Sequence, residues 1–327
     1  MDISCAFATS PSTPEHIALA ERLGYTRAWC YDSPALYPDV WMVLALAADR
    51  TDRIGLGPAV LVPSLRHPMT NAAAIATLCQ LAPGRVAVAI GSGFTGRYVL
   101  GQRAMRWVDV AEYVRALRAL LRGDDVDWDG GRLRMMHPDG FGPARPVDVP
   151  ILIGADGPKG LAVAAELGDG VFSAGQPSGG DASGWRAMLT FGTVLDEGES
   201  AESERVLLAA GHAAAVAYHA LYERRGAAGV DALPGGAGWR QAVEAFPAEE
   251  RHLAIHEGHL VAANERDQAA LAEAPGLAAS ITFTGTRSEL RDRLDQLETA
   301  GVTEIAYQPA GPDIPRELDA FMAMARS

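Results

Sequence analysis

The only lysine of the chain, Lys159, lies in the sequence Ile-Leu-Ile-Gly-Ala-Asp-Gly-Pro-Lys-Gly at positions 151–160, where an apolar strand-like run gives way to a helix-like run. Glycines at such a junction let backbone amides point at a ligand, and the start of a helix carries partial positive charge. Lysine adds a compact, strongly hydrated point charge. The residues therefore predict a phosphate-binding turn, with a solvated surface lysine as the alternative interpretation.

Further candidate ligand-binding residues follow other strand-like runs. They are Asp32 and Ser33, Ala59 and Val60, Gly91, Ser92 and Gly93, and Gln176. If the fold is a parallel barrel, its strands present their carboxyl ends at one active face. We therefore expect these residues to converge there with the turn Gly154, Ala155, Asp156, Gly157, Pro158 and Lys159. Asp32 is also suited to capping a helix and Ser92 to closing a turn.

The elements that must position these residues alternate along the chain. Short apolar runs predict eight strands, near residues 5, 29, 57, 88, 152, 171, 191 and 306. Helical patterns cover 14–23, 41–48, 69–81, 106–121, 160–167 and 288–300. Strands separated by helices pair in parallel through right-handed crossovers. The order predicts an α/β fold, the (β/α)8 TIM barrel, with an open doubly wound sheet as the competitor.

We expect one barrel domain over residues 1–327 with two insertions. The first, about 97–150, contains a turn-rich acidic run at 124–129 that we interpret as a solvated loop. The second, about 196–280, is largely helical from 201 to 274. Either insertion is suited to shape a binding site or a lid.

Composition excludes several classes of function. The net charge of -13 argues against nucleic acid as a partner, because phosphate backbones need a basic face. No basic region precedes an apolar stretch near the N-terminus, and no apolar run approaches the roughly 20 residues of a membrane helix. We therefore expect a cytoplasmic protein that does not bind membranes.

Two familiar motifs are present only in part. Residues 91–96 match GxGxxG, but we expect no helix to open immediately and no acidic residue at the next strand end, so a Rossmann site is disfavoured. His252, His256 and His259 lack the i, i+4 histidine pair around a glutamate of zinc proteases. We therefore interpret them as part of a capped, partly exposed helix and expect no metal.

Three stretches together resemble the bacterial luciferase-like superfamily. They cover residues 53–68, 72–78 and 83–93, and residues 154–170 are similar to the phosphate-binding turn and following helix of one branch. That branch uses the deazaflavin coenzyme F420 and includes methylenetetrahydromethanopterin reductases. The resemblance extends over residues 13–195 and 281–309.

The resemblance implies a (β/α)8 barrel whose mouth binds the isoalloxazine-like ring. Asp32, Ser33 and the Ala59–Val60 pair would lie beside the ring, and residues 154–159 would surround the phosphate. It further implies a cis peptide between Ala59 and Val60, and a homodimer.

The sequence departs from the family's sugar-oxidising members, which carry a histidine and a glutamate where this chain has Ser33 and Phe94. Their general acid and base therefore cannot be carried over. Asp32, Tyr37 and His67 are the remaining candidates for proton transfer. Phe94 and Tyr37 predict an apolar or aromatic small-molecule substrate.

Three functions follow as hypotheses. The first is hydride transfer between reduced F420 and an unsaturated organic substrate, since deazaflavin has a carbon in place of the central redox nitrogen of flavin. The second is a monooxygenase that uses reduced FMN. The third is a non-catalytic cofactor-binding barrel.

Overall fold

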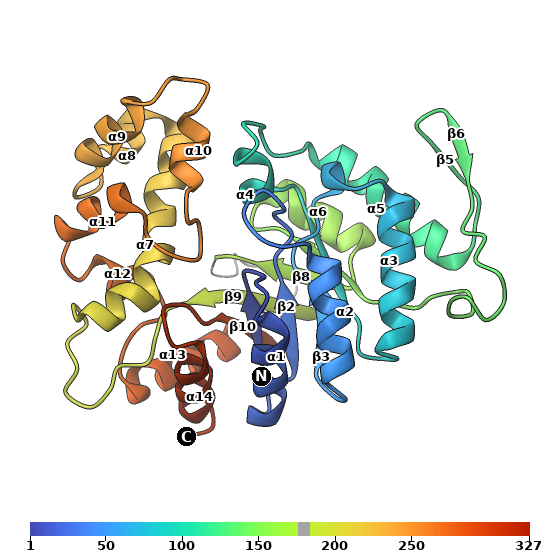
Figure 1. The fold of residues 1–327 in the computed structure, drawn as a ribbon, viewed down its shortest axis with the longest axis horizontal. Coiled ribbons are helices and arrows are strands. Elements are labelled where there is room, and N and C mark those ends of the chain that lie inside the picture. Colours follow the sequence, from blue (N-terminus) through green and yellow to red (C-terminus); the bar gives the residue numbers. More distant parts are fainter. Residues whose placement is uncertain (176–183) are drawn as a thin grey trace. The chain divides into compact units, whose positions relative to one another are not determined.

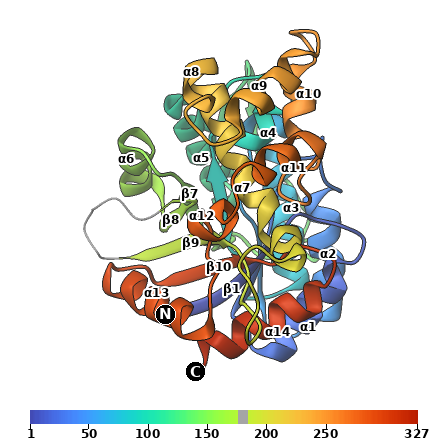
Figure 2. The same ribbon diagram turned by 90° about the vertical axis from the view of Figure 1, so that its left-hand side faces the viewer.

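The computed structural model describes residues 1–175 and 184–327. Eight parallel strands form one sheet in the order β3-β2-β1-β10-β9-β8-β7-β4 (Figures 1 and 2). Parallel bridges from Leu56 to Val86 and from Leu61 to Ile90 link its two edges. The sheet is therefore a nearly closed barrel, which confirms the predicted (β/α)8 fold. The strands are β1 (Asp2–Phe7), β2 (Arg27–Cys30), β3 (Gly55–Pro58), β4 (Val88–Gly91), β7 (Ile151–Gly154), β8 (Gly170–Ser173), β9 (Trp185–Phe191) and β10 (Glu304–Gln308).

Helices follow the strands and cover the outside of the sheet (Figure 1). Each contacts the next along the chain, as alternating strands and helices require. Three of the helices begin with proline in the first turn, where its missing amide hydrogen has no cost. These helices are α1 (Thr13–Leu23), α2 (Val40–Arg50), α3 (Pro68–Leu81), α5 (Trp107–Arg122) and α6 (Pro158–Leu167).

Internal contacts divide the chain into two compact units. The first comprises Met1–Gly96, Arg103–Leu189 and Gly301–Ala306, and the second comprises Arg97–Gln102, Thr190–Ala300 and Tyr307–Ser327. The organisation as a single domain with two insertions stays a prediction. No helix in the described residues has both the length and the apolar character of a membrane span.

The second unit is mainly helical, as the pattern over 201–274 indicates. Its long helix α7 packs on four shorter ones around a buried cluster that includes Tyr218, Trp239 and Leu271. Its helices are α7 (Glu204–Arg225), α8 (Ala227–Val230), α9 (Gly236–Glu244), α10 (Arg251–His256), α11 (Glu265–Ala272), α12 (Leu277–Ile281), α13 (Arg287–Thr299) and α14 (Ile314–Ala325).

The acidic run at 124–129 differs from the expected loop. Part of it forms strand β5 (Val126–Trp128), which pairs antiparallel with β6 (Gly131–Leu133). Asp125 accepts hydrogen bonds from Arg134 and Arg132, which lower its pKa to about 2. The arginines that follow the run offset its charge, so a hairpin forms where the composition alone suggested a loop.

A buried carboxylate joins three barrel strands, β2, β9 and β10. Glu304, the first residue of β10, accepts from the indole N–H of Trp29 at 2.7 Å and from that of Trp185 at 2.6 Å. The guanidinium of Arg27 lies 4.8 Å from the centre of the Trp185 ring. Both indole donors are thereby satisfied inside the barrel, where an unpaired N–H is costly.

Replacing Glu304 with glutamine is expected to lower the free energy of unfolding by about 1–3 kcal/mol. Glutamine has one acceptor oxygen, so one of the two indole N–H groups would face an amide NH2 donor. Urea denaturation measures the change. Adding Trp185→Phe, which removes the second donor, should cost less in the Glu304→Gln background than in the wild type. Equal costs in both backgrounds would contradict the assignment.

Candidate functional site

The carboxyl ends of β4 and β7 lie side by side, and each ends in a glycine. Gly91 and Gly154 are register partners. A Cβ on Gly91 would lie 2.8 Å from Cγ2 of Val60, and a Cβ on Gly154 would lie 2.6 Å from Cγ1 of Val60. These three predicted residues therefore converge, and glycine at both strand ends leaves the space that Val60 fills.

The segment that carries Val60 is held on both sides. The Ala59–Val60 peptide is cis, which confirms the expectation drawn from the resemblance. The Ala59 amide donates to the Cys30 carbonyl at the end of β2 at 2.8 Å, and the Leu61 amide donates to the Ala89 carbonyl in β4 at 2.7 Å. Hydrogen bonds to two neighbouring strands thus fix Val60 at the rim of the barrel.

The turn after β7 leads into α6, whose N-cap is Gly157 and whose first helical residue is Pro158. No side chain caps this end, so the amides of Lys159 and Gly160 have no intrahelical partner. A Cβ on Gly157 would meet no described residue within 4 Å, and Lys159 is exposed. Two amides without an intrahelical partner, the positive end of a ten-residue helix and an ammonium group fit a phosphate.

Two other residues of this turn, Ala155 and Asp156, bond to β8 and to the residues that follow it. Ala155 is buried, and its amide donates to the Phe172 carbonyl in β8 at 3.1 Å. Asp156 accepts from the amides of Ala174 and Gly175, at 3.1 and 3.2 Å, with one carboxylate oxygen. Asp156 therefore holds the end of β8 to the turn. Gln176 falls in residues 176–183, outside the described part of the chain.

The residues after β4 form a tight turn. Gly93 has a φ of 81°, a left-handed conformation that favours glycine, and the Ser92 carbonyl accepts from the Met105 amide at 2.8 Å. Contrary to our expectation, a short helix, α4 (Phe94–Tyr98), opens directly after the turn. It has only five residues and β4 belongs to a barrel, so the GxGxxG match does not mark a Rossmann site.

Asp32 is buried at the end of β2 and is paired with an arginine that sequence reasoning missed. Nη1 of Arg66 donates to both carboxylate oxygens of Asp32 at 2.6 Å, and Nη2 donates to Asp39 at 2.7 Å. Burial raises the pKa of Asp32, and the hydrogen bonds from Arg66 offset part of that rise. Asp32 is therefore a paired structural anion at the rim, beside the buried Ser33.

The other two proton-transfer candidates have distinct surroundings. Tyr37 is buried, and burial raises the pKa of its hydroxyl. His67 is exposed and caps α3, with Nδ1 accepting from the Met69 amide at 3.2 Å. Nδ1 of His67 therefore has a structural role as a helix cap. The catalytic assignments of Asp32, Tyr37 and His67 stay predictions.

His252 and His256 lie on the partly exposed helix α10, as we had expected, but His259 lies beyond its end. His256 and His259 are buried, and they meet His219, which lies on α7. The sequence analysis missed His219 because it stands 37 and 40 positions before the other two.

The fold and the strand-end turns define a barrel that presents a candidate phosphate-binding site at its rim. A model of the luciferase-like monooxygenase family matches residues 8–304. The chain belongs to that family, and it is an enzyme of the luciferase-like oxidoreductase group, as the resemblance implied.

Similar proteins carry more specific names. The chain is 29% identical to a 5,10-methylenetetrahydromethanopterin reductase of Archaeoglobus fulgidus, over 91% of this chain and 90% of the relative. It is 35% identical to an F420-dependent glucose-6-phosphate dehydrogenase of Mycobacterium avium, over 40% of each chain. The structure of the coenzyme F420-dependent tetrahydromethanopterin reductase of Methanopyrus kandleri superposes with a TM-score of 0.68 at 18% identity, over 100% of this chain and 99% of that one. These findings confirm the resemblance to the F420-dependent branch.

Proposed function

We propose that this enzyme transfers hydride between reduced coenzyme F420 and an unsaturated organic substrate. The observation that carries the proposal is the joint presence, in the first unit, of the Val60 rim between Gly91 and Gly154 and the uncapped start of α6 beside Lys159. The named relatives that use F420 support the same cofactor. F420, when bound, supplies a hydride from carbon, which favours two-electron reduction over oxygen activation.

Different residues of the rim would bind the phosphate and the ring of the cofactor. The amides of Lys159 and Gly160 and the Lys159 ammonium hold the phosphate, while Val60 and Ser33 border the flat ring. Val60 fills the space beside Gly91, so the ring would contact Val60 there and approach the backbone at Ser92 and Gly93. Arg66 holds Asp32 in its paired form and so keeps the end of β2 in place.

Hydride delivery to an unsaturated acceptor also requires a proton. Arg66 occupies both oxygens of Asp32, which makes that carboxylate a poor donor. Tyr37 stays protonated because burial raises the pKa of its hydroxyl. His67 uses Nδ1 to cap α3, and its second ring nitrogen, Nε2, takes no part in that cap. We therefore assign the proton to Tyr37 or His67, with an apolar or aromatic substrate between them and Phe94.

Replacing Gly157 with alanine is the sharpest test of the phosphate position. The free protein has open space there and a φ of -106°, so alanine should leave the thermal midpoint nearly unchanged. A phosphate seated on the α6 amides would meet the added methyl group, and the F420 dissociation constant should rise at least about tenfold. Fluorescence titration with F420 measures the constant.

Two variants serve as comparisons for that titration. Gly131→Ala, in the β5–β6 hairpin, adds a Cβ that meets the Trp128 carbonyl oxygen at an ordinary contact distance of 3.7 Å, and it should bind F420 as the wild type does. Lys159→Met should weaken F420 binding to a similar degree as Gly157→Ala. Unchanged affinity in both Gly157→Ala and Lys159→Met would refute the phosphate site.

The same titrations decide among the three functions. Preference for reduced FMN with oxygen-dependent turnover would favour the monooxygenase. Failure to bind either cofactor, or binding without turnover of any acceptor, would favour the non-catalytic barrel.

Two further expectations concern the state of the protein. We propose a homodimer, which the resemblance implies, and a cytoplasmic location, which the sequence analysis predicts. Sedimentation equilibrium should give about twice the mass of the 34.5 kDa chain, and a monomer would refute the dimer.

A further inference from the structure

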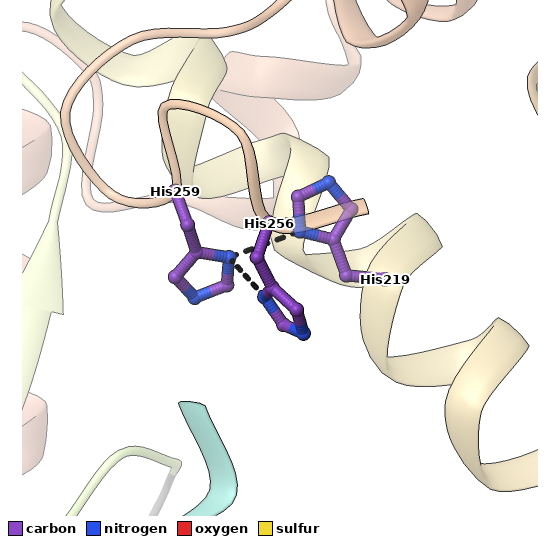
Figure 3. Close-up of side chains that lie close together, drawn as sticks. All are labelled: His219, His256 and His259. Carbon is purple, nitrogen blue, oxygen red and sulfur yellow. Dashed lines mark hydrogen bonds between the residues drawn. The ribbon is translucent and has the colours of Figure 1, made fainter. Parts of the chain in front are cut away.

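Three buried histidines of the second unit meet at their Nδ1 atoms (Figure 3). His219 comes from α7, His256 ends α10, and His259 follows three residues later. Nδ1 of His259 lies 3.0 Å from Nδ1 of His219 and 3.3 Å from Nδ1 of His256. Their exposed fractions are at most 2%. Histidines of two separate segments thus point one nitrogen each at a common position.

The opposite ring nitrogens of two of these histidines are held by carboxylates. Nε2 of His219 lies 3.1 Å from Asp267 Oδ1, and Nε2 of His256 lies 2.7 Å from Glu223 Oε1. An ionised carboxylate only accepts, so each Nε2 carries the hydrogen and each Nδ1 presents a lone pair. A carboxylate behind the imidazole is the arrangement that orients metal-ligating histidines in proteins.

The hydrogen bonds cannot all be satisfied by neutral rings. The lone pairs of His219 and His256 both point at Nδ1 of His259, which carries at most one hydrogen. A cation bound by all three Nδ1 atoms would satisfy every lone pair.

The charged residues around the three histidines also favour a bound cation. Glu223 and Asp267 are buried side chains, and in the described residues neither bonds an arginine or lysine. Among the described residues, Glu223 Oε2 has no hydrogen-bond partner, whereas Asp267 also accepts from the indole N–H of Trp239 at 2.8 Å. Buried negative charge without a cationic partner is expensive. A divalent cation would balance it.

The spacing suits a tetrahedral metal. Ligand nitrogens about 2.0–2.1 Å from zinc lie about 3.3 Å from one another, close to the two Nδ1 separations of 3.0 and 3.3 Å. One ligand atom from each of the three residues lies within 4.8 Å of the others. Small rotations of the rings therefore suffice to seat an ion.

We propose that His219, His256 and His259 form a site for a divalent transition metal, with Zn²⁺ as the preferred ion. Imidazole ligands suit Zn²⁺, Co²⁺ and Ni²⁺, and three histidines leave a fourth position for water. The site ties α7 to the α10 segment in the helical unit. This inference is independent of the hydride transfer proposed for the barrel rim.

Metal titration of the full-length, chelator-treated protein tests the site. We expect one equivalent of Co²⁺ to bind and give the visible absorption of tetrahedral Co²⁺, and Zn²⁺ to displace it. Bound metal should raise the thermal midpoint, because it binds the folded state alone. No uptake of Co²⁺ or Zn²⁺ at micromolar concentrations would overturn the proposal and leave a hydrogen-bonded histidine network.

Three variants make the test specific. His259→Ala should lose the Co²⁺ spectrum and the metal-dependent rise in midpoint, whereas His252→Ala, on the same α10 helix but outside the cluster, should keep both. Glu223→Gln retains an acceptor for His256 and should bind metal about 10–100-fold more weakly while still folding. If both Glu223→Gln and His259→Ala bound metal with the affinity of the wild type, the ion would be bound elsewhere and the assignment would be overturned.

Discussion

Replacing Arg66 with methionine is expected to destabilise the first unit by about 3–5 kcal/mol, because it leaves the buried Asp32 carboxylate without its partner. Methionine matches much of the arginine stem but supplies no donor. The variant should also bind F420 poorly, since the end of β2 that borders the proposed ring site loses its anchor. Chemical denaturation and cofactor titration measure the two effects.

The loss caused by Arg66→Met should depend on pH. Burial already raises the pKa of Asp32, and removing Arg66 would raise it further. A folded-state pKa above the unfolded value of about 3.9 means that the ionised carboxylate costs stability at higher pH and costs nothing once protonated. Asp39, whose pKa is lowered by Arg66 and two backbone amides against the effect of burial, would lose stabilisation above about pH 4. The variant should therefore be closer to the wild type at pH 5 than at pH 8.

Arg115→Met is the matched control for this prediction. Arg115 pairs with Glu166 on the exposed surface of the same unit, so its loss should change stability by at most about 0.5 kcal/mol at either pH. If Arg66→Met behaved like Arg115→Met, the buried pair would not contribute as described.

Replacing Gly57 with alanine is expected to cost about 3 kcal/mol or more, or to prevent folding. A Cβ on Gly57 would lie 1.8 Å from the backbone carbonyl oxygen of Ala87. That oxygen cannot rotate away, so the two chain segments would have to separate. Separation would stretch the bonds from Leu56 N to Arg85 O, at 2.8 Å, and from Ala87 N to Leu56 O, at 3.2 Å. These bonds help to close the barrel.

Circular dichroism melts of Gly57→Ala and Gly131→Ala give the comparison. Gly131 has only one neighbouring atom, at 3.7 Å from the added Cβ, and its substitution should be nearly neutral. Equal midpoints for the two variants would contradict the close approach at Gly57.

The sequence was sufficient for the fold because the barrel is built from local patterns. All eight predicted strands are present. Apolar runs such as 88–91 are buried along their whole length, which is typical of strands in a parallel sheet. The strand-end glycines were also identifiable, because parallel pairing brings carboxyl ends to one rim. The cis peptide at Ala59–Val60 came from family resemblance alone.

The side-chain partnerships were beyond the reach of sequence patterns. Arg66 is one of many arginines, and its pairing with Asp32 depends on how β2 and the segment after β3 are placed in space. His219 joins two histidines that lie far along the chain, and periodicity within one helix carries no information on such a meeting. The hairpin in the acidic run likewise depends on arginines that follow it.

The Glu304 cluster is built on β2, β9 and β10, whereas the glycine rim is built on β4 and β7, which has a consequence for engineering. The two groups therefore share no strand. Substitutions at sites without shared partners usually add independently in free energy. A directed-evolution library around Trp29 and Trp185 can therefore raise thermal stability, and that stability allows a second library at the rim to accept destabilising substitutions that change the substrate range.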